Sequence, residues 1–175
     1  SLSAAVSTVD GYVVPATSES IGRLAVLDLG VKTSTLNYLA ARGFEVHVLP
    51  QSIALEELLK LDPVAVFYSN GPGAPAASDH HVALLQGVLR QGLPFFGICF
   101  GNQLLGRALG YGTYKLPFGH RGINQPVVDV ETGRTEFTSH NDPATSANSM
   151  PSGSTAKARV MPGSISVTTK CGLPP

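Results

Sequence analysis

The chain has 175 residues and a formal net charge of 0, with 43% hydrophobic and only 14% charged residues. This length is enough for the core of one α/β domain. A neutral chain without a basic run gives no reason to expect nucleic acid or an anionic membrane as a partner. The two cysteines, Cys99 and Cys171, match neither a disulfide framework nor a metal-ligand spacing, so we expect a cytoplasmic protein without a bound metal.

Residues 1–22 are small and polar, and Tyr12–Pro15 is their only apolar cluster. This composition predicts an arm or linker rather than the start of a compact domain. The first strand is expected over 24–30, because a continuous apolar run that closes in glycine is typical of a strand buried on both faces.

Helical and extended patterns then alternate as far as Gly110. Ser34 and Asp79 are expected to cap the first and third helices. The alternation has βαβ spacing four times over, which predicts a doubly wound, mainly parallel α/β sheet with helices on both faces. The expected helices cover 34–42, 55–61, 79–90 and 100–109, and the expected further strands cover 44–49, 64–68 and 94–97.

The fourth of these strands ends in Gly97-x-Cys99-x-Gly101, and an amphipathic helix pattern follows at once. This pattern is typical of a nucleophile elbow, a sharp strand-to-helix turn that holds a reactive side chain above a sheet. The helix N-terminus behind Cys99 favours a thiolate and can line an oxyanion hole. A buried cysteine in a glycine-rich turn gives the same motif. A functional Cys99 is favoured because the glycine-bearing loops at 28–30 and 69–73 are expected at the same sheet edge.

The pattern changes after Gly110. A strand is expected over 113–116, a loop over 117–124, and a hairpin over 127–137 around Thr132 and Gly133. From Asp142 onward there is no aromatic residue and no further acid, and Ser, Thr, Pro and Gly dominate. Such a composition buries too little apolar surface to offset its ordering entropy, so residues 142–175 are predicted to be disordered.

Four separated segments match a known family in order and spacing. They are Leu27–Lys32, Ser69–Gly73, Gly97–Gln103 and Thr113–Asn124. The second and third resemble class I glutamine amidotransferases, and the first and last resemble the small-subunit family of carbamoyl phosphate synthetases. The likeness covers about residues 1–141, and it implies that residues 23–141 are a partial amidotransferase domain. It also implies that residues 1–22 are the arm from a missing N-terminal domain.

The resemblance implies hydrolysis of L-glutamine. Cys99 would attack the side-chain amide and form a glutamyl thioester, and ammonia would pass to a large synthetase subunit. That subunit would use ATP and Mg²⁺, so no cofactor is expected in this chain, and its carbamoyl phosphate would feed arginine and pyrimidine synthesis. Backbone N–H groups near Gly71 and of Phe100 would form the oxyanion hole. By the same likeness the substrate's polar groups would be held by Gly71, Gly73, Gln103 and Asn141.

The histidines do not supply the base that the family uses. Family members pair the thiol with the His and Glu of a His-Pro-Glu motif, which this sequence lacks. His120 lies in a separate motif that the family carries in addition. His47, His80 and His81 are expected to be structural or solvated.

The likeness stops at Asn141, where residues 142–144 read Asp-Pro-Ala in place of the family's His-Gly-Phe. This abrupt change suggests a shift of reading frame near codon 141. We therefore expect impaired or absent glutaminase activity. Two alternatives remain open: a non-catalytic fragment that docks on a partner or binds glutamine weakly, and another thiol amidotransferase or hydrolase on the same scaffold.

Overall fold

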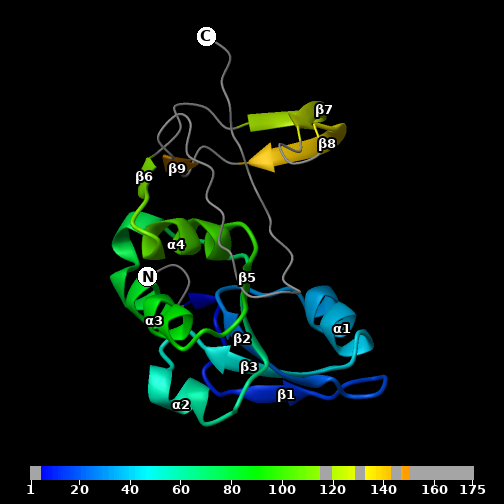
Figure 1. Cartoon of the computed structure of the whole chain (residues 1–175), viewed down its shortest axis with the longest axis vertical. Coiled ribbons are helices and arrows are strands. Elements are labelled where there is room, and N and C mark those ends of the chain that lie inside the picture. The colour runs from blue at the N-terminus through cyan, green and yellow to red at the C-terminus, as the bar shows by residue number, and fades with distance from the viewer. Residues whose placement is uncertain (1–4, 115–119, 129–132, 143–146, 150–175) are drawn as a thin grey trace. The chain divides into compact units, whose positions relative to one another are not determined.

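The computed structural model describes residues 5–114, 120–128, 133–142 and 147–149 (Figure 1). The chain divides into two compact units, one over residues 1–113 and one over residues 114–175. The first unit contains the sheet, its helices and the cysteine elbow. The second contains a β-hairpin.

The sheet of the first unit has five strands in the order β1-β3-β2-β4-β5. Strands β2 to β5 run parallel, and β1 pairs antiparallel with β3 at one edge. The strands are β1 (Tyr12–Val14), β2 (Gly22–Asp28), β3 (Phe44–Pro50), β4 (Ala65–Tyr68) and β5 (Phe95–Gly97).

Each parallel strand is followed by a helix, which confirms the predicted doubly wound architecture. The helices are α1 (Thr33–Ala41), α2 (Leu55–Leu59), the 3-10 helix η2 (Pro75–Ala77), α3 (Asp79–Arg90) and α4 (Phe100–Ala108). Among the described residues, no helix is long and apolar enough to cross a membrane. The predicted caps were wrong by one or two residues, because Lys32 and Ser78 occupy the N-cap positions and neither side chain makes a capping bond.

Alternate residues of the buried strands face two separate cores. Leu24 and Val26 of β2 pack with α1 on one face, while Ala25 and Leu27 pack on the other face with α2, α3 and α4. The helices accordingly lie on both sides of the sheet in Figure 1. Period-2 alternation inside a continuous apolar run is expected when both faces are covered.

Strand β1 lies within the stretch that the sequence predicts to be an arm. Tyr12–Val14 pair with Val46–Val48, and the Thr8 backbone N–H donates to Asp28 Oδ2 at 2.7 Å. The described part of this stretch therefore completes one edge of the sheet. Its link to a preceding domain stays a prediction.

The second unit contains strands β7 (His120–Val128) and β8 (Thr135–Asp142), which form an antiparallel hairpin. The predicted hairpin is confirmed, but its first arm includes residues 120–124, where a loop was expected. Strand β6 (Gly112–Tyr114) lies at the boundary of the units. Strand β9 (Ala147–Ser149) lies within the range predicted to be disordered, and residues 143–146 and 150–175 lie outside the described residues.

Candidate functional site

Cys99 is the second residue of the two-residue connection between β5 and α4, and it has φ 52° and ψ −107°. A positive φ is unusual for a residue with a side chain, and such conformations cost on the order of 1–3 kcal/mol. The thiol side chain is exposed. The strained turn and the exposed side chain match the geometry of the predicted elbow and contradict the alternative of a buried structural cysteine. The role of Cys99 as a nucleophile stays a prediction.

Three backbone hydrogen bonds hold the elbow in place. The Ile98 N–H donates to the Tyr68 carbonyl at 3.1 Å, and the Gly101 N–H donates to the Ile98 carbonyl at 3.0 Å. The Gln103 N–H donates to the Cys99 carbonyl at 3.1 Å, which closes the first turn of α4. The elbow is thus bonded on one side to β4 and on the other to its own helix.

The glycines of the motif are required by close backbone contacts. A Cβ on Gly101 would overlap the carbonyl oxygen of Tyr68, and a Cβ on Gly97 would lie 2.6 Å from the Gly101 carbonyl carbon. Both positions face backbone, which cannot move aside as the end of a side chain can. The sharp turn at Cys99 therefore depends on these two residues having no side chain.

The loop after β4 approaches the elbow from the neighbouring strand. A Cβ on Gly73 would lie 2.9 Å from Cζ of Phe100, so this backbone packs on the buried ring of the first residue of α4. A Cβ on Gly71 would overlap the carbonyl oxygen of Leu29, which follows β2. The structure thus confirms the prediction that the three glycine-bearing loops converge at one sheet edge.

A hydrogen-bond network centred on Asp28 fixes the first of these loops. The buried Asp28 carboxylate accepts the N–H groups of Gly30 at 3.0 Å and of Val31 at 2.9 Å. Asn70 Nδ2 donates to the Gly30 carbonyl at 3.1 Å, which ties this loop to the one that carries Gly71. Sequence analysis assigned no role to Asp28 or Asn70. The signal for Asp28 was a carboxylate at the end of an otherwise apolar buried run.

The predicted site residues fall into two groups. Cys99, Phe100, Gly71 and Gly73 lie together in the first unit, and Gln103 follows Cys99 by one turn of α4. Asn141 belongs to β8 in the second unit, where it pairs with Arg121 of β7. The first unit by itself therefore brings together the thiol and the glycine loops.

The start of α4 places positive partial charge from the backbone at the elbow. Phe100 is the first residue of α4, so its N–H has no partner within the helical ladder and lies at the positive end of the helix dipole. Tyr68, beneath the elbow, is fully buried, and burial raises the pKa of its hydroxyl above the ordinary value. Tyr68 therefore stays neutral, and its hydroxyl donates to the His81 carbonyl at 3.4 Å.

His47, His80 and His81 make no hydrogen bond to the Cys99 thiol. His47 Nε2 lies 2.6 Å from Glu45 Oε1 on β3, and this contact lowers the pKa of the Glu45 carboxyl. His81 is buried at the start of α3, and burial, with a smaller contribution from His80, lowers the pKa of its imidazole. The structure thus supports the prediction that His47 is structural.

Comparison with known proteins agrees with this geometry. The glutamine amidotransferase class-I family matches residues 25–170. The carbamoyl phosphate synthase small chain of Streptomyces coelicolor is 56% identical over 140 residues, and that of Mycobacterium tuberculosis is 55% identical over 143 residues. Both matches cover 80% of this chain but only 37% and 38% of the relatives, so the chain spans little more than a third of their length.

Solved structures show the same fold. A glutamine amidotransferase from Thermotoga maritima superposes with a TM-score of 0.51 at 20% identity, covering 74% of this chain and 63% of that one. A glutamine amidotransferase from Methylobacillus flagellatus gives a TM-score of 0.52 at 18% identity, covering 77% and 59%. At these identities the likeness shows the fold alone. Together with the family match over most of the sequence, it places the chain in the class-I glutamine amidotransferase family.

Proposed function

We propose that this chain carries the thiol and oxyanion half of a glutaminase site, as part of a carbamoyl phosphate synthase small subunit. The observation that carries the proposal is the strained, exposed Cys99 at the N-terminus of α4, whose next residue, Phe100, packs against Gly73 of the glycine loop 70–73. The high identity to carbamoyl phosphate synthase small chains favours this role over that of another thiol hydrolase.

The chemistry would begin with attack of the Cys99 thiolate on the side-chain carbonyl of glutamine. The carbon–nitrogen bond then breaks, ammonia leaves with a proton, and a glutamyl thioester remains on Cys99. Water hydrolyses the thioester to glutamate and regenerates the thiol. The Phe100 N–H and an N–H of loop 70–73 would stabilise the oxyanion in both steps.

Binding of glutamine would involve the groups around the thiol. Gly71 and Gly73 would present backbone groups, Gln103 would contribute from α4, and Asn141 would contribute from β8. Ammonia would go to a large synthetase subunit, to which we also assign ATP and Mg²⁺. A role in the cytoplasm, in arginine and pyrimidine synthesis, follows from the same assignment.

Because this sequence lacks the His-Pro-Glu motif, we expect a low rate of glutamine hydrolysis. Expulsion of ammonia needs a proton that a neighbouring imidazole would normally deliver, and general acid–base catalysis typically contributes about 10²–10⁴-fold. We therefore propose that the whole chain acylates slowly and turns over poorly. Added imidazole would supply the missing proton and raise the rate.

Ammonia release from glutamine, with and without imidazole, tests this function. We expect slow release that imidazole increases, that Cys99→Ala abolishes, and that Cys171→Ser leaves unchanged. Equal release from Cys99→Ala, or no release even with imidazole, would contradict a thiol glutaminase. Hydrolysis of an ester in preference to glutamine would favour the alternative thiol hydrolase, and glutamine binding without any acylation would favour the non-catalytic fragment.

A further inference from the structure

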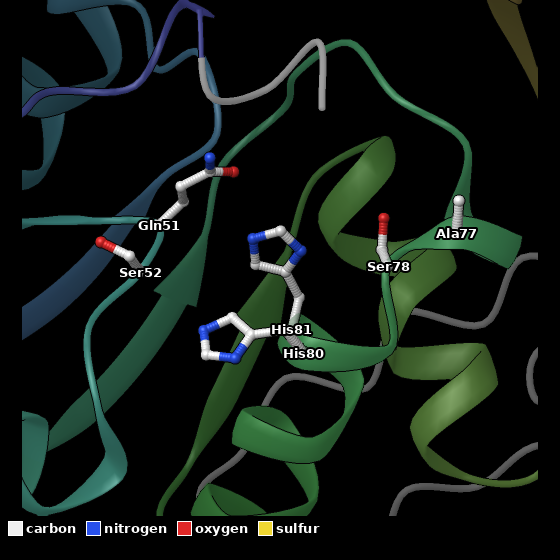
Figure 2. A pocket seen from close by; sticks show the side chains of 6 residues that line it. All are labelled: Gln51, Ser52, Ala77, Ser78, His80 and His81. Carbon is white, nitrogen blue, oxygen red and sulfur yellow. The ribbon is translucent and has the colours of Figure 1, made fainter.

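A pocket lies at the start of α3, away from the cysteine motif in sequence (Figure 2). It has a volume of roughly 220 Å³ and is lined by Gln51, Ser52, Ala77, Ser78, His80 and His81. None of these residues belongs to the elbow or to the glycine loop 70–73. Figure 2 shows both imidazoles at the start of α3, opposite the loop that carries Gln51 and Ser52.

The unusual feature of this pocket is His81. Its side chain is 6% exposed, yet neither Nδ1 nor Nε2 has a hydrogen-bond partner among the described residues. A buried polar group without a partner costs about 1–3 kcal/mol, so such groups are rare unless a ligand or water satisfies them. Because the unpartnered imidazole lines the pocket, a ligand bound there would supply the missing hydrogen bonds.

The chemistry around His81 favours an anion. The positive end of α3, a 12-residue helix, lies at the pocket, because Ser78 is its N-cap and His80 and His81 lie in its first turn. The His80 ring lies 5.6 Å from the His81 ring, and both residues line the pocket. Most of these groups donate hydrogen bonds or carry positive partial charge.

The one acid in this turn does not oppose an anion strongly. The Asp79 side chain is 84% exposed, and its Oδ1 is paired with Arg107 Nη2 of α4 at 2.8 Å. Arg107 also donates to the Pro75 carbonyl at 2.6 Å, which places a guanidinium beside the loop that leads into α3. A metal ion fits less well, because no group of three or more His, Cys, Asp or Glu side chains gathers among the described residues.

We propose that this pocket binds a small oxyanion, a phosphate or carboxylate group, through His81, His80 and the N-terminus of α3. The anion fills the hydrogen-bonding capacity of His81 and stabilises its protonated form. This site is separate from the glutaminase chemistry and does not depend on it.

Thermal unfolding of the whole chain tests the proposal at pH 7, with phosphate or acetate replacing chloride at constant ionic strength. We expect one or both anions to raise the Tm in a saturable way. The rise should disappear in His81→Leu, shrink in His80→Gln, and persist in His47→Gln, whose imidazole lies on β3 outside the pocket. Because leucine leaves no buried nitrogen without a partner, His81→Leu should fold at least as stably as the unaltered chain in chloride.

The same experiment can overturn the proposal. An equal, non-saturating rise in His81→Leu would show a general salt effect. A His81-dependent rise with Zn²⁺ but not with either anion would show a metal site. Should His81→Leu not fold, NMR of the histidine rings in the unaltered chain decides: saturable movement of the His81 signals with phosphate or acetate supports the site, and unmoved signals contradict it.

Discussion

Two helices of the first unit begin at the same edge of the sheet, but the connections that lead into them differ in length. Helix α4 follows β5 through the two residues Ile98 and Cys99, whereas α3 follows β4 through the ten residues 69–78. The short connection forces a positive φ and holds the thiol exposed. The long connection relaxes through η2 and leaves a pocket beside a buried imidazole. The first connection thus places backbone strain beside an exposed thiol, and the second leaves space beside a buried imidazole.

The largest loss of stability is expected at Gly101, where the elbow leaves no space for a side chain. Gly101→Ala places a Cβ against the Tyr68 carbonyl, which should destabilise the first unit by about 3 kcal/mol or more. Gly110→Ala is the matched control, because Gly110 ends the same helix with φ +89° and no atom within 4 Å of a Cβ; we expect it to cost about 1–2 kcal/mol. Urea unfolding measures both. Equal losses would show that the close contact at Gly101 is not what shapes the turn.

Relief of the strain at Cys99 should have a smaller and opposite effect. Glycine tolerates φ 52° without the clash of a Cβ, so Cys99→Gly should unfold with a free energy about 1–2 kcal/mol higher than Cys99→Ala. Both variants lack the thiol, so the difference reports the backbone alone. A Cys99→Gly protein no more stable than Cys99→Ala would mean that the elbow stores no strain.

The Tyr68 hydroxyl links β4 to the start of α3. Tyr68→Phe removes its bond to the His81 carbonyl while it keeps the buried ring, so we expect a loss of about 1 kcal/mol. The edge-to-face contact with Phe95, at 5.1 Å between ring centroids, should be retained. Chemical denaturation checks the magnitude. A loss of unfolding free energy as large as that of Gly101→Ala would indicate that the hydroxyl does more than make this one hydrogen bond.

The smallest effect is expected in the pH dependence of stability. Burial and His80 lower the pKa of His81 in the folded chain, so the unfolded chain binds the proton more readily. The contribution of His81 to stability is therefore full above its unfolded pKa of about 6.5 and is lost as pH falls through the lower folded value. His80, Asp79 and Arg107 flank this group. In chloride, we expect the free energy of unfolding to fall less steeply between pH 7 and pH 5 in His81→Leu than in the unaltered chain. Urea unfolding at several pH values measures this slope. An unchanged slope would contradict the lowered pKa of His81.

The sequence predicted the parallel sheet and the elbow because both have local signals. A continuous apolar run over 24–30 requires a strand covered on both faces, and Gly97-x-Cys99-x-Gly101 requires a turn in which backbone meets backbone. The glycine loops could also be placed at one edge, because parallel strands carry their carboxyl ends on the same side.

Other features depend on long-range contacts and could not be predicted from local pattern. Tyr12–Val14 become a strand only because the edge of β3 is available to pair with them. Residues 120–124 are extended because the far end of β8 continues the ladder, with Arg121 opposite Asn141. The unpartnered state of His81 depends on which groups surround it in the fold, so sequence analysis assigned it a structural or solvated role.

Covalent labelling by an electrophilic glutamine analogue tests the central claim most directly. Intact and peptide mass spectrometry of the whole chain should find one label on Cys99, slowed by excess glutamine, with Cys171→Ser labelled at the same rate and Cys99→Ala unlabelled. Such a result would show that the elbow holds a nucleophile beside a glutamine-binding surface. Labelling of Cys99 and Cys171 at equal rates, without protection by glutamine, would contradict it.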